Sequence, residues 1–223
     1  MVNKLKTTNL SEFLETVFQQ ADIIGLGETV HGEHLDVFKE LNKLSNKLSD
    51  SLSGIFLELP NDFQPSVNYY LETMKFDKNL SNLIKGAAIE GKYFEKMYVY
   101  IFEFARKIGI PVICTDSSKT QNKEYKNKYP KNPSWYLKGK SRDEDMAEII
   151  KENYCQKKGK WFFIAHLGHT GYEITYNNHI PAGSLLRKDL KEKYYCLGLL
   201  YKKTKSSNYN MLIPTQEMVD SFV

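Results

Sequence analysis

The chain has 223 residues, 41% of them hydrophobic and 26% charged, which is long enough for one domain with a sizeable core. A net charge of +4 and a pI near 8.7 are too weakly basic to indicate a nucleic-acid or membrane partner. Three cysteines without a CxxC pair argue against a disulfide scaffold. The first residues form no apolar leader, and no apolar run reaches membrane-spanning length. We therefore expect a single cytoplasmic domain over residues 1–223.

Hydrophobic spacing predicts helices and strands that alternate along the chain. The predicted helices cover residues 10–20, 35–48, 61–74, 80–89, 92–108, 142–157 and 181–193. The predicted strands cover residues 21–27, 54–59, 110–115, 161–166 and 194–201, with a short one at 210–213. Residues 117–140, rich in lysine, asparagine and proline, are predicted to form a long loop or lid. The alternation predicts an α/β fold, a three-layer sandwich in which helices flank a mainly parallel central sheet.

Ionisable side chains follow four successive predicted strands. They are Glu28 and His31 after the first strand, Glu58 at the end of the second, Asp116 after the third, and His166 and His169 after the fourth. Ligands of parallel sheets bind beyond the C-terminal ends of the strands. Because these strand ends meet at one edge, the side chains predict an active site there.

A histidine held by a carboxylate is a general base that can activate water. Glu28 and His31, three residues apart in a tight loop, are candidates for such a pair. Glu58 could share this work or bind the water. His166 and His169 could act as a general acid or stabilise an oxyanion.

Arg142 begins a predicted helix and could bind a substrate carbonyl, carboxylate or phosphate. Its alternative role is a structural or surface ion pair, and the sequence leaves both open. The remaining histidines, His34 and His179, are interpreted as structural or exposed residues.

Other chemistries fit the sequence less well. No GxSxG nucleophile elbow is present, and the apolar surroundings of Cys114 favour a buried strand residue over a nucleophile. In GLGETVHG, Val30 replaces the third glycine of a dinucleotide-binding loop. The histidines and glutamates of residues 28–34, together with Glu58 and the His166/His169 pair, are ligand types that suit zinc or iron, but HGEH is not the HExxH spacing. A metal-dependent site is therefore kept as an alternative.

Four motifs in order resemble the erythromycin esterase family. They are LGETVHG at 26–32, GIFLELP at 54–60, SRDEDMAEII at 141–150 and WFFIAHLGHTG at 161–171. The resemblance spans about residues 23–201. It implies a metal-independent hydrolase in which His31 activates water against an ester carbonyl, with Glu28 and Glu58 as acidic partners. It also implies that Arg142, His166 and His169 line the site.

The chain departs from that family in three respects. Leu167 occupies a position where the family has asparagine, and Lys191 a position where it has glycine. The chain also looks short beside members that inactivate antibiotics, and the missing length would belong to the helices around the macrolide cleft. A macrolide is therefore not the expected substrate.

The sequence as a whole favours a hydrolase of an ester or amide in a small or peptide-linked substrate. The expected catalytic residues are His31, Glu28, Glu58 and His166, and the expected substrate-binding residues are Arg142, His169 and Asp116. No cofactor is expected, although a divalent metal is possible, and no nucleic-acid or membrane partner is expected. The alternatives are a metal-dependent hydrolase, a haem- or iron-binding module of the same fold, and a tailoring enzyme in natural-product or peptide biosynthesis.

Overall fold

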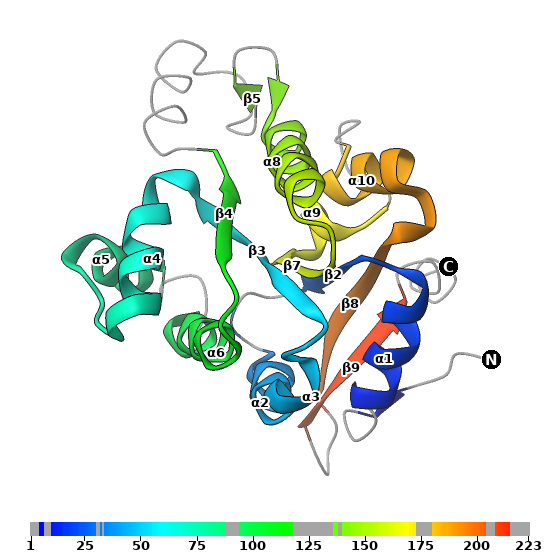
Figure 1. Ribbon diagram of the computed structural model, residues 1–223, viewed down its shortest axis with the longest axis horizontal. Coiled ribbons are helices and arrows are strands. Elements are labelled where there is room, and N and C mark those ends of the chain that lie inside the picture. The colour runs from blue at the N-terminus through cyan, green and yellow to red at the C-terminus, as the bar shows by residue number, and fades with distance from the viewer. Residues whose placement is uncertain are drawn as a thin grey trace.

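The computed structural model describes residues 5–6, 10–29, 32, 34–87, 94–117, 136–137, 140–172, 180–203 and 208–214. A seven-stranded sheet crosses the molecule, with the strand order β1-β9-β8-β2-β7-β3-β4 (Figure 1). Its strands are β1 (Leu5–Lys6), β2 (Ile23–Glu28), β3 (Leu52–Pro60), β4 (Val112–Asp116), β7 (Lys160–His166), β8 (Tyr194–Lys203) and β9 (Asn208–Pro214). The strands from β8 to β4 are parallel, and β9 and β1 add antiparallel pairs at one edge. The mainly parallel sheet predicted from the sequence is thus confirmed.

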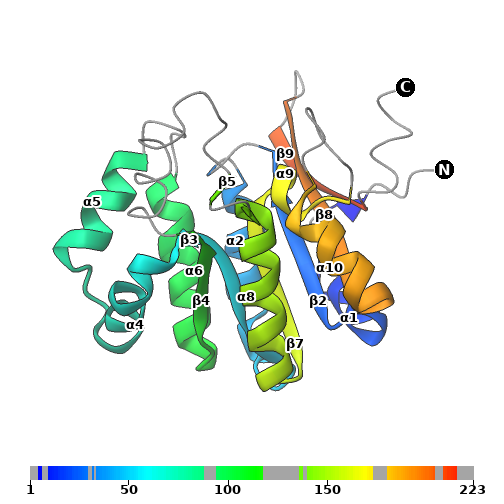
Figure 2. The same ribbon diagram turned by 90° about the horizontal axis from the view of Figure 1, so that it is seen from above.

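Helices cover both faces of the sheet and form two apolar cores. One face packs against α1 (Leu10–Gln20), α2 (Leu35–Lys43), α3 (Ser45–Leu48), α4 (Gln64–Thr73), α5 (Lys78–Ala87) and α6 (Phe94–Ile108). The other packs against α8 (Arg142–Gln156), α9 (Leu167–Thr170) and α10 (Ala182–Leu190). Figure 2 shows α8 and α10 on the opposite side of the strands from α2. This is the predicted three-layer α/β arrangement. Within the described residues, no helix is both long and apolar enough to cross a membrane.

Short elements account for most differences from the predicted boundaries. The predicted helix over 35–48 is two helices, α2 and α3, that meet at Leu44. Two short 3-10 turns, η2 (Asn61–Phe63) and η4 (Lys191–Lys193), flank helices that were predicted as single segments. The four-residue α9 and the small antiparallel pair β5 (Tyr136–Leu137) and β6 (Lys140–Ser141) were not predicted. A single turn is too short to show periodic spacing, so hydrophobic patterns cannot reveal it.

Two glycines bring α9 close to its neighbours. A Cβ added at Gly27 of β2 would lie 2.3 Å from Thr170 Oγ1 and 2.7 Å from Leu167 Cδ1. A Cβ at Gly183 of α10 would lie 2.0 Å from the carbonyl oxygen of Thr170. Glycine is required where two backbones approach this closely. These contacts hold α9, which carries His169, against β2 and α10.

The Gln64 side chain closes the outer edge of β4, the last strand of the sheet. Its Nε2 donates to the carbonyl of Val112 (2.8 Å), and its Oε1 accepts from the N–H of Cys114 (2.8 Å). The amide thus takes the place of a further strand, which protects an otherwise open edge from pairing with another chain.

Lys191 lies in a strained backbone conformation, at the position where the family pattern has glycine. Its φ is +55° and its ψ is −126°, in a region that glycine occupies readily and other residues avoid. We therefore expect Lys191→Gly to raise the free energy of unfolding by about 1 kcal/mol, after the entropy cost of glycine is subtracted. Urea denaturation measures this change. As a control, Lys188→Gly inside α10 should lower the free energy of unfolding by about 1 kcal/mol. A loss of stability in both variants would refute the strain argument.

Candidate active site

Arg142, the first residue of α8, joins the C-terminal ends of two strands. Its Nε and Nη2 donate to the two carboxylate oxygens of Asp116 in β4, at 2.5 and 2.6 Å. Nη2 also donates to Oε1 of Glu58 in β3 (2.7 Å). Burial lowers the pKa of Arg142, but the hydrogen bonds and charges of the two carboxylates raise it above its ordinary value, so the guanidinium stays charged. The ion-pair role considered from the sequence is present, and the arginine side chain keeps 24% of its surface exposed.

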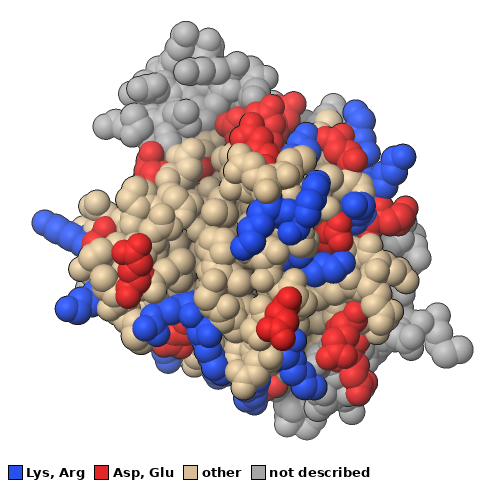
Figure 3. All heavy atoms as spheres, in the orientation of Figure 1, with Lys and Arg blue, Asp and Glu red and all other residues tan. Residues whose placement is uncertain are grey.

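Acidic side chains surround this start of α8. The first turn carries Asp143, Glu144 and Asp145, and acidic groups gather over it in Figure 3. Carboxylates are favoured at a helix N-terminus, where the backbone N–H groups carry partial positive charge. Asp145 also accepts a hydrogen bond from the Ser117 hydroxyl (3.0 Å), which ties α8 to the end of β4.

The Glu58 carboxylate connects three elements. Besides its bond with Arg142, its Oε2 accepts the main-chain N–H of His166 at the end of β7 (2.7 Å). Glu58 lies where the register of β3 shifts, because Leu57 is opposite Cys114 whereas Pro60 is opposite Asp116. Such irregularities redirect side chains next to active sites. The shift places the carboxylate between β7 and α8.

His169 and Asp143 form the histidine–carboxylate pair that the described residues contain. His169 Nδ1 lies 2.9 and 3.1 Å from the two carboxylate oxygens of Asp143, whose side chain is fully buried. Asp143 Oδ1 also accepts the main-chain N–H of Ala182 (2.8 Å), so α8, α9 and α10 meet at this carboxylate. The carboxylate fixes the ring orientation of His169 and keeps the Nδ1 proton in place.

The other nitrogen of His169 has two possible partners that require opposite protonation states. Nε2 lies 3.2 Å from Arg142 Nη1, a donor, and 3.5 Å from Glu58 Oε1, an acceptor. Burial lowers the pKa of His169, but the charge of Glu58 and the hydrogen bond and charge of Asp143 outweigh it and raise the pKa overall. A neutral His169 accepts from Arg142, and a protonated one faces Glu58. The ring can therefore take up or release a proton without moving.

Glu28 and His166 lie opposite each other in neighbouring strands, β2 and β7. Glu28 is 1% exposed, and its Oε1 accepts the N–H of Gly32 (3.3 Å). His166 Nδ1 accepts the N–H of Gly168 (3.1 Å) and caps α9. The proton of a neutral His166 ring is therefore on Nε2. His31 lies outside the described residues, so its role as the general base stays a prediction, as does the lid predicted at 117–140, most of which is also outside them.

A sequence comparison finds a family resemblance over part of the chain. The sequence model of the erythromycin esterase family matches residues 116–217, a little under half of the chain. Over this segment the chain is similar to the erythromycin esterase family. The matched segment contains Asp116, Arg142, His166 and His169, whereas Glu58, the other carboxylate bonded to Arg142, lies before it. A search of curated proteins finds no match.

Solved structures share the erythromycin esterase-like fold. A Bacillus cereus protein is 16% identical with a TM-score of 0.59, over 92% of this chain and 73% of its own. A variant of the erythromycin esterase EreC in its open conformation is 13% identical with a TM-score of 0.59, over 94% and 82% of the two chains. ChaN of Campylobacter jejuni, a haem-binding protein, is 16% identical with a TM-score of 0.52, over 95% and 96%. At these identities the likeness establishes the fold.

His34 and Cys114, two residues considered in the sequence, are both buried. The His34 ring is fully buried, and its Nε2 lies 3.2 Å from the Thr29 hydroxyl, which itself donates to the carbonyl of Leu199 (2.9 Å). Cys114 is 2% exposed, and burial raises the pKa of its thiol to about 12, which disfavours the nucleophilic thiolate. Among the described residues, no group of three or more histidine, cysteine, aspartate or glutamate side chains is arranged to hold a metal ion.

Sequence reasoning did not select Asp143 for the site. Its position beside Arg142 at a predicted helix start is equally typical of an acidic residue that stabilises the helix N-terminus. Its partner His169 is 26 residues away, and only the packing of α9 against α8 brings the two together. The SRDEDMAEII motif of the family resemblance, which includes this aspartate, was the signal that could have selected it.

Proposed function

We propose that the protein is a hydrolase that cleaves an ester or amide with water activated by a histidine–carboxylate pair. The observation that carries the proposal is the Arg142 guanidinium, which Asp116 and Glu58 hold in place at the C-terminal edge of the sheet. Parallel-sheet enzymes place their substrates at this edge. The erythromycin esterase family match over residues 116–217 supports an esterase-like reaction.

The hydrogen bonds of Arg142 indicate which substrate group it meets. Three of its five N–H groups face carboxylates, and one Nη1–H faces His169 Nε2. The second Nη1–H is left to donate to a substrate oxygen. Because two carboxylates already offset the arginine charge, a phosphate or carboxylate would meet net negative charge here. A neutral carbonyl, which gains negative charge only in the transition state, is the better substrate group.

In the proposed reaction His31, paired with Glu28, removes a proton from water, and the hydroxide adds to the carbonyl carbon. The remaining Nη1–H of Arg142 stabilises the developing oxyanion. The Nε2–H of His166, whose Nδ1 caps α9, donates a hydrogen bond to the leaving oxygen or nitrogen. The protonated His31 then gives the proton that it took from water to the leaving alcohol or amine, as the bond to the carbonyl carbon breaks. No metal takes part in this scheme.

The experiment that tests this function measures hydrolysis of p-nitrophenyl acetate and p-nitroacetanilide by the purified protein, before and after dialysis against EDTA. We expect release of p-nitrophenol or p-nitroaniline above the spontaneous rate, with the same kcat in both preparations. Absence of turnover on both probes would reject the proposed function. Loss of turnover after EDTA and its return with added Zn²⁺ would favour the metal-dependent alternative.

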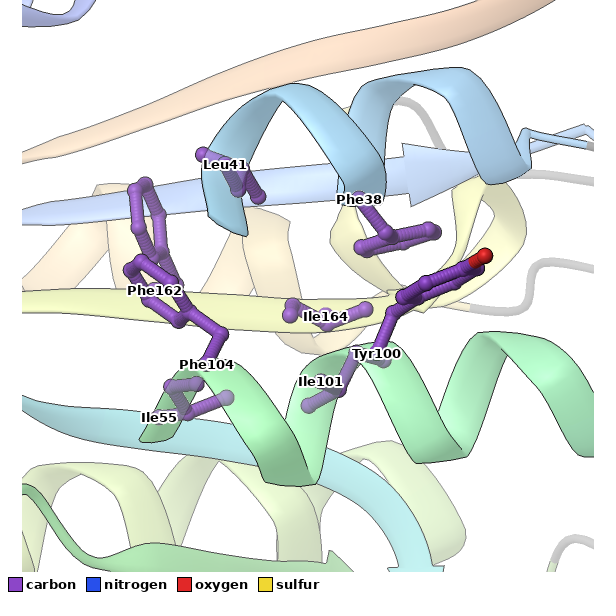
Figure 4. Close-up of a pocket in the computed structure, with 8 residues that line it drawn as sticks. All are labelled: Phe38, Leu41, Ile55, Tyr100, Ile101, Phe104, Phe162 and Ile164. Atoms are coloured by element: carbon purple, nitrogen blue, oxygen red, sulfur yellow. The ribbon is translucent and has the colours of Figure 1, made fainter. Parts of the chain in front are cut away.

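A haem-binding role is the second candidate, because the chain and the haem-binding protein ChaN match over nearly their full lengths. The described residues give haem little support. His34 bonds through Nε2 to Thr29, and His169 bonds through Nδ1 to Asp143, which leaves His166 Nε2 as the candidate iron ligand among the described histidines. The apolar gap between α2, α6 and the sheet, drawn in Figure 4, is too narrow for a water molecule. Titration with haemin should therefore give no Soret band beyond that of free haemin, and a saturable shifted band would favour the haem role.

A further inference from the structure

Tyr98 of α6 reaches the site from the opposite face of the sheet to α8. Its hydroxyl donates to the main-chain carbonyl of Glu58 (3.4 Å), and its side chain is 3% exposed. Apolar packing fixes the helix that carries it, because Tyr100, Ile101 and Phe104 of α6 pack toward β7 (Figure 4). A rigid helix therefore delivers the hydroxyl to the end of β3.

The Glu58 backbone lies in an irregular part of β3. The pairing of β3 with β7 ends at Leu57 opposite Ile164, and the pairing with β4 moves from Leu57 directly to Pro60. The Tyr98 hydroxyl adds a hydrogen bond to the Glu58 carbonyl where the register of β3 shifts, and so helps to hold the main chain there.

The electrostatic surroundings of Tyr98 keep its hydroxyl a donor. Burial raises the pKa of Tyr98 well above its ordinary value, and the negative charges of Glu58 and Glu28 raise it further. These two carboxylates come from β3 and β2, which lie on either side of β7. The phenol therefore remains protonated between the two acidic strand ends of the proposed site.

We propose that Tyr98 is a positioning residue that holds the irregular end of β3, so that the Glu58 carboxylate can bridge Arg142 and the His166 N–H. The inference rests on the proposed hydrolase function for its catalytic consequence. Tyr98 acts through Glu58, whose carboxylate bonds to Arg142 (2.7 Å) and to the main-chain N–H of His166 (2.7 Å). Loss of the hydroxyl should loosen the β3 end and misalign both bonds.

The test compares Tyr98→Phe with Tyr70→Phe. Both tyrosines are buried and both rings contact Phe102, at centroid distances of 5.9 and 5.3 Å. The two variants thus lose the same atom from one aromatic cluster, but only Tyr98 bonds to Glu58. In Tyr98→Phe we expect kcat on p-nitrophenyl acetate to fall about tenfold with KM within about twofold of wild type. The His166 amide should exchange its hydrogen about tenfold faster. Tyr70→Phe should change neither quantity.

Amide exchange also separates this inference from the proposed function, because it needs no substrate. If the wild-type protein hydrolyses neither probe, the hydrolase proposal fails and the exchange rate of His166 decides the role of Tyr98 alone. Equal exchange rates in Tyr98→Phe and Tyr70→Phe would overturn the positioning role. Faster exchange in an active Tyr98→Phe protein with unchanged kcat would overturn it as well.

Discussion

Replacing Arg142 with methionine should lower the free energy of unfolding by about 3–5 kcal/mol, which is the range for removing one partner of a buried ion pair. Asp116 accepts two hydrogen bonds from Arg142 and Glu58 accepts one, and their side chains are only 9% and 11% exposed. Methionine fills part of the volume but leaves both carboxylates without their cation. Urea denaturation at about pH 7.5 measures the loss, because both carboxyl groups are ordinarily ionised at that pH.

The loss should shrink as the pH falls. Burial raises the pKa of Asp116 above 3.8 even with Arg142 present, and removal of the arginine raises it further. A carboxyl whose folded pKa exceeds its unfolded value destabilises the fold as the pH rises through that interval. Arg142→Met should therefore regain part of its stability when the pH is lowered toward about 5. The control is Arg106→Met on the exposed end of α6, for which we expect a change of about 0.5 kcal/mol or less. Similar losses in the two variants would refute the buried network.

Sequence patterns predicted most of the fold because its elements are long and amphipathic. The predicted helix over 10–20 coincides with α1, and the five predicted parallel strands match β2, β3, β4, β7 and β8 within a few residues. Each of these segments buries a continuous apolar face, which dominates its local pattern. β9 was expected as a short strand, and the structure extends it to Asn208–Pro214.

The site was harder to predict because its geometry depends on single bonds between distant elements. The strand-end argument selected Glu58, Asp116 and His169, and the helix start selected Arg142. It could not show that one arginine joins these three side chains, since that depends on how α8 packs on the sheet. Tyr98 looked like an ordinary core aromatic, because its hydroxyl finds Glu58 only where the β3 register shifts. The Glu28–His31 pair lies partly outside the described residues and stays a prediction.

Replacing His31 with alanine should lower kcat/KM on p-nitrophenyl acetate by about a thousandfold, within the range for loss of a general base. Without the imidazole, no other group in the proposed scheme removes the proton from the attacking water. The Arg142 contacts should survive, because they form among Glu58, Asp116 and His169. The free energy of unfolding should therefore stay within about 1 kcal/mol of wild type.

Steady-state hydrolysis of p-nitrophenyl acetate by wild-type protein, His31→Ala and His179→Ala is the most direct test of the central claim. His179 is the matched control, since no role in the site is assigned to it. We predict wild-type activity within about twofold for His179→Ala and a thousandfold loss for His31→Ala, with cooperative unfolding preserved in both. A folded His31→Ala protein that keeps wild-type kcat/KM would contradict the assignment of His31 as the base that activates water.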